Sequence, residues 1–141
     1  MLLYRQLAGK LMAAALLLAV AGCSESGLDP IDGGGNASPI SFAADLQPVF
    51  ADHCLNCHSV GGSGGLDLSP DVAWVNIVDV ETTNYPQRQR IVSGNPDESI
   101  LYLKLIGDSG AGPSMPLNRP LLTEDITEKF RLWILDGAPK N

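Results

Sequence analysis

Two cysteines and a histidine lie close together near the middle of the chain, in Cys54-Leu55-Asn56-Cys57-His58. Thiols three positions apart lie on one side of a helical turn, so both can bond to vinyl groups on one edge of the same porphyrin. The imidazole of the next residue would then reach the iron from the proximal side. This C-x-x-C-H pattern is typical of covalent haem attachment. It predicts one haem c held through Cys54 and Cys57, with His58 as an iron ligand.

Other chemistries of the cysteine pair fit the sequence less well. A zinc site needs about four ligands, and apart from Cys23 the chain offers two cysteines and two histidines, with His53 directly beside Cys54. A thioredoxin-like redox pair needs a βαβ context, of which the sequence has no sign. A disulfide between Cys54 and Cys57 would leave the adjacent His58 unexplained.

Residues 1–22 have the features of an export signal. Arg5 and Lys10 form a basic start, and the apolar run 11–21 is too short to span a bilayer comfortably. Small residues followed by Cys23 end this run, which resembles a bacterial lipobox. We therefore expect cleavage before Cys23 and a lipid on its thiol. The alternatives are an ordinary secretory signal with a chance cysteine, or a retained membrane helix.

Export would place the protein in the compartment where bacterial c-type haem is attached. Lipid on Cys23 and haem on Cys54 and Cys57 would also use all three cysteines. Ser24 stands where many lipoproteins retained at an inner membrane have Asp. By that resemblance, we expect a lipid anchor in the periplasmic leaflet of the outer membrane, if the cell has two membranes.

The remaining chain is acidic and long enough for one small domain. Removal of residues 1–22 leaves 119 of 141 residues, with seven basic and all sixteen acidic side chains, a formal net charge of −9. This charge argues against nucleic acid as a partner. It suits contact with a basic patch on a redox partner protein, or simply keeps the domain soluble. Residues 23–39 are predicted to be the lipidated cysteine and a flexible tether, because residues 24–39 are rich in Gly, Ser and Asp without apolar periodicity. The domain itself is expected at 40–141.

Apolar spacing and capping residues predict four helices, over 41–53, 70–78, 96–105 and 123–136. Ser41 is a suitable cap for the first helix. Pro48 is awkward inside it, so this helix begins late, is kinked, or consists of two short turns. In the second helix we expect Val75 to be buried, and in the third we expect Tyr102 and Lys104 to lie away from the apolar face.

Met115 is the second residue that could bind the iron. It lies in the proline-rich segment 111–122, 57 residues after His58, and is the only methionine beyond residue 22. A thioether on the distal side would give His/Met ligation, which raises the haem potential. The alternative is a methionine that fills a gap in the core.

Two supporting contacts are also expected. The Nδ1–H of His58 should donate to a backbone carbonyl, from the loop 61–68, to fix the ring. Arg88 or Arg90 is a candidate partner of a haem propionate, because Arg binds carboxylates bidentately. A solvated loop arginine is the alternative.

Together these segments resemble a mono-haem class I cytochrome c, over about residues 40–140. The matching stretches are Cys54–His58, Gly64 to Leu68, Gly94 to Leu101, Met115-Pro116, and Trp133 to Ala138. The resemblance is closest to compact domains of bacterial lipoprotein and multidomain cytochromes. It implies an all-α fold, wrapped around one covalent haem with long Gly/Pro-rich loops. It also implies that Cys54 and Cys57 carry the haem, with His58 as proximal and Met115 as distal ligand.

The expected function is electron transfer rather than catalysis, with both axial positions filled by protein. No acid/base constellation stands out among the scattered carboxylates. The alternative is a haem enzyme or gas sensor, peroxidase-like, with a vacant or labile sixth iron position. A further alternative is a lipid-anchored structural module without haem.

Overall fold

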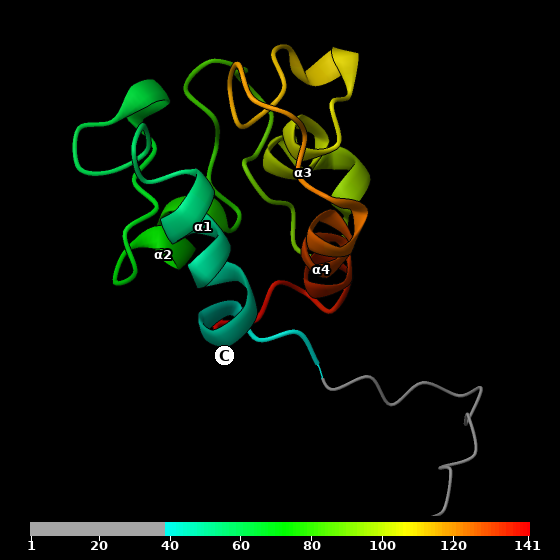
Figure 1. The fold of residues 1–141 in the computed structure, drawn as a ribbon. Coiled ribbons are helices and arrows are strands. Elements are labelled where there is room, and N and C mark those ends of the chain that lie inside the picture. The colour runs from blue at the N-terminus through cyan, green and yellow to red at the C-terminus, as the bar shows by residue number, and fades with distance from the viewer. Residues whose placement is uncertain (1–38) are drawn as a thin grey trace, which may run out of the picture. The chain divides into compact units, whose positions relative to one another are not determined.

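The computed structural model describes residues 39–141 (Figure 1). The predictions for the signal 1–22, for Cys23 and for nearly all of the tether 23–39 lie outside the described residues. Within 39–141 the structure is helical and has only isolated β-bridges, such as Val78 with Ile91. The expectation of an all-α fold is confirmed for this part of the chain. No helix in it is long and apolar enough to cross a membrane.

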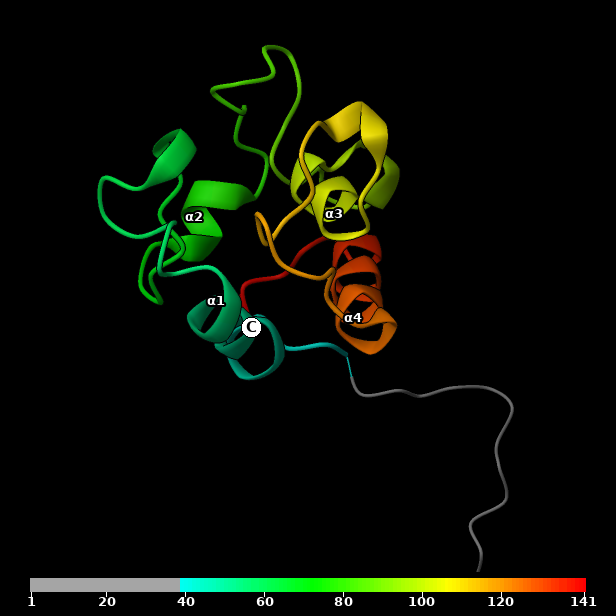
Figure 2. The ribbon, with the colours of Figure 1, turned by 45° about the horizontal axis from the view of Figure 1, so that its top comes forward.

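Four α-helices and several single turns make up the described residues. In chain order they are a π-helical turn Phe42–Leu46, α1 Gln47–His53, a 3₁₀ turn Ser63–Gly65, α2 Ala73–Ile77, a 3₁₀ turn Pro96–Glu98, α3 Ile100–Leu105, a 3₁₀ turn Ser109–Ala111, and α4 Glu124–Leu135. Figures 1 and 2 show α1 and α2 on one side, α3 and α4 on the other, and the loop that leads to α3 between them.

The first predicted helix consists of two pieces, one of the alternatives that Pro48 left open. Ser41 caps the first piece, and its Oγ accepts from the N–H of Ala44 at 3.2 Å. Pro48 lies in the first turn of α1, where a helix does not need the missing N–H. The proline therefore begins a new helix instead of interrupting one.

Helix α2 begins at Ala73, later than the sequence predicted. The carbonyl of Ser69 accepts from the amides of Val72 at 3.1 Å and Ala73 at 2.8 Å, so a backbone turn precedes the helix. Ala73 and Ile77 are fully buried, whereas Val75 is 51 % exposed. The predicted burial of Val75 is wrong, because residues 73 and 77 share one face of the helix and residue 75 lies off that face.

The third predicted helix is broken at Ser99, whose backbone is extended between the Pro96–Glu98 turn and α3. Ser99 is fully buried, and its hydroxyl donates to the carbonyl of Asn95 at 2.8 Å and accepts from the N–H of Val92 at 2.9 Å. Tyr102 is buried, contrary to prediction, and Lys104 is half-buried.

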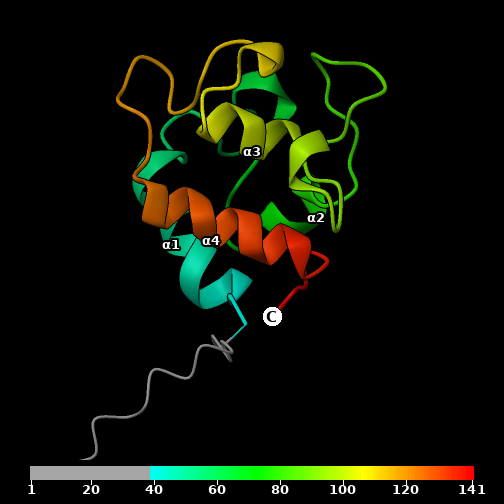
Figure 3. The same cartoon turned by 90° about the vertical axis from the view of Figure 1, so that its right-hand side faces the viewer.

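Aromatic side chains join the first and last helices of the domain. The ring centroids of Phe42 and Trp133 are 5.4 Å apart, and those of Phe50 and Phe130 are 5.5 Å apart. These rings are buried, and the indole N–H of Trp133 donates to the carbonyl of Pro139 at 2.9 Å. Figure 3 shows α4 between α3 and the π-helical turn. This core fixes α1, which leads directly into the cysteine motif.

Candidate cofactor site

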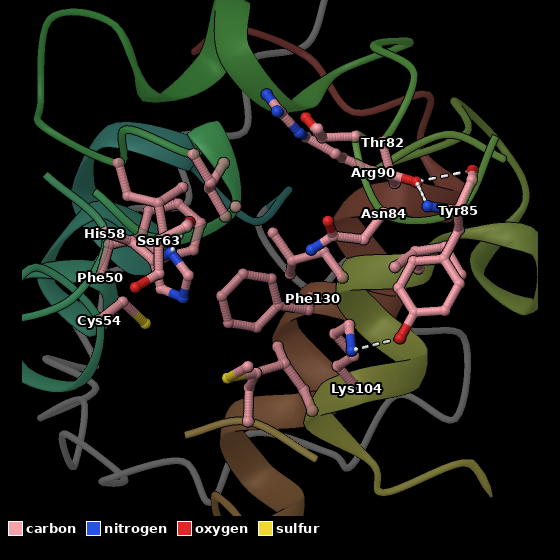
Figure 4. A pocket seen from close by; sticks show the side chains of 18 of the residues that line it. Phe50, Cys54, His58, Ser63, Thr82, Asn84, Tyr85, Arg90, Lys104 and Phe130 are labelled. Carbon is pink, nitrogen blue, oxygen red and sulfur yellow. Dashed lines mark hydrogen bonds between the residues drawn. The ribbon is translucent and has the colours of Figure 1, made fainter. Parts of the chain in front are cut away.

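A cavity lies between the two groups of helices. Its volume is about 180 Å³, and its lining is mostly apolar. Concave, mostly apolar pockets with a few polar groups are typical of small-molecule and cofactor sites. Residues of α1, α3 and α4 line it, together with the segment after the cysteine motif and the loop 82–85. Figure 4 shows Cys54 and His58 on one side, opposite Tyr85 and Lys104.

Residues 54–58 form a single turn that continues from α1. The amides of Cys57 and His58 both donate to the carbonyl of Cys54, at 3.1 and 2.9 Å. Cys54 is half-buried and lines the cavity, Cys57 is exposed, and both are free thiols. Burial, with a smaller contribution from Cys57, raises the pKa of Cys54 to about 11. Reactive redox cysteines have a lowered thiol pKa instead.

The imidazole ring of His58 makes one hydrogen bond, to the backbone. Its Nδ1 lies 3.0 Å from the carbonyl oxygen of Ser63. A carbonyl oxygen only accepts hydrogen bonds, so Nδ1 carries the proton and Nε2 keeps a free lone pair. The predicted contact with a carbonyl of the loop 61–68 is confirmed, and Ser63 is the acceptor. His58 lines the cavity and has the tautomer that binds a metal through Nε2.

Gly62 allows the tight loop that brings Ser63 back to His58. A Cβ at position 62 would lie 2.5 Å from the carbonyl oxygen of Cys57 and 2.7 Å from that of Ser59. Real Cβ atoms do not come so close, and only glycine avoids the clash. The N–H of Ser63 donates to the carbonyl of Cys57 at 2.9 Å, which closes the loop.

Met115 lines the same cavity as Cys54 and His58. It is half-buried and packs against the main core, and its N–H donates to the carbonyl of Lys104 at 2.9 Å. The structure thus brings Met115 to the cavity of the cysteine motif, although 57 residues separate it from His58.

Two positively charged side chains, those of Arg90 and Lys104, line the otherwise mostly apolar cavity. The Nη1 and Nη2 of Arg90 donate to the carbonyls of Asn76 at 2.6 Å and Gly65 at 3.1 Å. Burial lowers the pKa of Arg90 from its ordinary value, although a guanidinium stays charged. Arg88, the other sequence candidate, donates to the carbonyl of Gly110 instead, at 3.3 Å.

Lys104 is the second of these cations, and sequence reasoning missed it. The expected helix 96–105 places it away from the apolar face, but Lys104 is half-buried and lines the cavity. The salt bridges found within residues 39–141 are Lys129 with Asp45 and Arg131 with Glu128. Neither Arg90 nor Lys104 therefore has a carboxylate within 4.0 Å among these residues.

Side chains that bind free metal ions do not gather anywhere in residues 39–141, where no group of three or more His, Cys, Asp or Glu side chains is found. Position 23, the predicted lipid site, lies outside the described residues. Comparison of the chain with protein-family models, with curated proteins and with solved structures found no match.

Proposed function

We propose that the protein transfers electrons through a single haem c, bound covalently by Cys54 and Cys57 in a class I cytochrome c-like fold. His58 and Met115 would be the axial ligands of the iron. One observation carries the proposal: His58, with Nε2 free, and Met115 line the same apolar cavity as Cys54. The bound haem would supply an iron that changes between the ferric and ferrous states.

The residues around the cavity fit such a cofactor. The hydrogen bond from Nδ1 to Ser63 orients the ring of His58 and increases its strength as a ligand. The mostly apolar lining would surround the cofactor with few polar groups, and ligation by a histidine and a methionine thioether would raise its reduction potential. Both effects suit a carrier that accepts and releases one electron without binding a substrate.

Arg90 fits a role as the partner of a haem propionate. A guanidinium has five N–H donors, and Arg90 donates two of them, to the carbonyls of Asn76 and Gly65. The other donors are left for a carboxylate. A partly buried cation beside an apolar cavity, without a protein carboxylate nearby, is a suitable site for the acidic edge of the cofactor.

The proposal includes export and a lipid anchor on Cys23, which would hold the domain on the periplasmic side of a bacterial membrane, with the outer membrane as the expected site. The acidic charge of −9 for residues 23–141 suits redox partner proteins with basic patches. Replacement of Cys23 by serine should move the protein from the membrane fraction to the soluble fraction.

Purification of the full chain from a host that attaches c-type haem tests the function. We expect a haem stain that survives denaturing electrophoresis, and loss of that stain in Cys54→Ser/Cys57→Ser. We also expect low-spin spectra in both redox states and no carbon monoxide binding by the reduced protein. High-spin haem with ready carbon monoxide binding would instead favour a haem enzyme or gas sensor. A wild-type chain without covalent haem would contradict both functions.

A further inference from the structure

The ammonium group of Lys104 donates hydrogen bonds to three oxygen atoms. Its Nζ lies 2.7 Å from the carbonyl oxygen of Ala111, 3.2 Å from that of Pro113 and 3.3 Å from the hydroxyl of Tyr85 (Figure 4 shows the last contact). An ammonium group has three N–H donors. Three acceptors therefore use its full capacity, and no donor is left for a haem carboxylate, unlike at Arg90.

The backbone of Lys104 holds the same segment at a second point. Its carbonyl accepts from the N–H of Met115 at 2.9 Å. The side chain thus binds residues 111 and 113, and the main chain binds residue 115. One residue of α3 contacts three of the five positions of segment 111–115.

Tyr85 packs closely against the same segment. Gly112 has a φ of +74°, and a Cβ there would clash with the hydroxyl of Tyr85. The ring of Tyr85 lies under the ammonium group of Lys104, with Nζ 5.0 Å from its centroid. Lys104 therefore joins three segments that line the cavity or support its lining: the loop 82–85, α3, and the segment 111–115.

We propose that Lys104 is a positioning residue that holds segment 111–115 so that Met115 faces the cavity. This proposal rests on the proposed function for its meaning, because Met115 is the distal ligand there. A charged donor suits the task, since hydrogen bonds from an ammonium group are stronger than those from a neutral donor. Three prolines in 111–122 remove backbone donors that could otherwise anchor the segment.

The test compares the full-length holoprotein of the wild type with Lys104→Leu, Lys104→Arg and the control Lys140→Leu. Lys140 is exposed and lies over the ring of Trp74, so its replacement changes the net charge equally without touching segment 111–115. The rate of amide hydrogen exchange at 111–115 measures how firmly the segment is held. The charge-transfer band of ferric methionine ligation and the reduction potential show whether Met115 binds the iron.

In Lys104→Leu we expect exchange at 111–115 at least about tenfold faster, a weaker methionine band and a lower potential, with haem content unchanged. Lys104→Arg should restore part of each, and Lys140→Leu should change none. Unchanged exchange and an unchanged band in Lys104→Leu would overturn the proposal. If that variant does not fold, Lys104→Gln, which lacks the charge and the reach of the ammonium group, replaces it, and unchanged exchange with an unchanged band would again overturn the proposal. A wild type without the methionine band contradicts the proposed ligation alone, since exchange tests the hold independently.

Discussion

The Nδ1 atom of His58 lies 3.0 Å from the carbonyl oxygen of Ser63, five residues later in the chain. This contact sets the tautomer of the imidazole and leaves Nε2 free on the side of the cavity. The loop between the two residues is short, and its path depends on one glycine, which makes the contact open to a direct test.

Gly62→Ala should disturb this contact. The new Cβ would lie 2.5 Å from the carbonyl oxygen of Cys57, so the loop has to shift and take Ser63 with it. We expect a loss of about 1–3 kcal/mol in the free energy of unfolding and a lower ratio of haem to protein, measured by denaturant titration and absorbance. Gly61→Asn is the control, because position 61 has open space and Asn tolerates its positive φ. Equal effects of the two changes would contradict the role given to Gly62.

Met115→Ala should remove the distal ligand and leave the fold intact. We expect the ferric charge-transfer band of methionine ligation to disappear and the reduced protein to bind carbon monoxide. Leu117→Ala is the matched control in the same loop, since Leu117 is 54 % exposed. Absorption spectroscopy of both variants decides, and an unchanged spectrum in Met115→Ala would show that Met115 only fills the core.

Arg90→Gln should destabilise the domain and lower the reduction potential. It leaves the carbonyls of Asn76 and Gly65 without their charged donor, at a cost of about 1–3 kcal/mol. It also removes a positive charge that favours the reduced iron. Arg88→Gln makes the same chemical change at a residue outside the cavity lining. Thermal unfolding and redox titration should separate the two variants, and equal shifts would disprove a special role of Arg90.

Asp45 should support the first helix in a pH-dependent way. The N–H of Ser41 donates to its carboxylate at 2.9 Å and Lys129 lies 3.3 Å away, and these contacts hold the pKa of Asp45 below its ordinary value of 3.8. The unfolded chain therefore binds the proton more tightly than the folded one. The stabilisation is present above pH 3.8 and is lost as the pH falls through the lowered folded-state pKa.

Asp45→Asn should remove this contribution. Urea unfolding at several pH values is expected to show a less stable variant near neutral pH, with the difference from the wild type shrinking in acid. Asp71→Asn, at an exposed carboxylate in the turn before α2, is the control for the chemical change itself. A constant difference for Asp45→Asn would contradict the assignment.

Apolar patterns that continue over several helical turns predicted the structure well. The apolar stripe of α4 places Phe130, Trp133 and Ile134 in the core, where all three are fully buried, and Gly137 ends the helix region with a φ of +88°. Twelve residues of consistent periodicity outweigh local ambiguity. Helices α2 and α3 are only five and six residues long. In helices this short, packing of the core decides which face is buried. The expected burial of Val75 was therefore wrong.

The sequence by itself determined the chemical types and the local turn of the site: two thiols and an imidazole in residues 54–58, an all-helical fold, and Met115 as the one other candidate ligand. The spacing of the cysteines and the histidine within one turn can be recognised from the sequence, as can the apolar pattern of the helices. Only the tertiary structure decided that Met115 shares a cavity with His58, and that Arg90 and Lys104 line the same cavity. These relationships join segments that are brought together by packing of the core, which no local spacing of residues encodes.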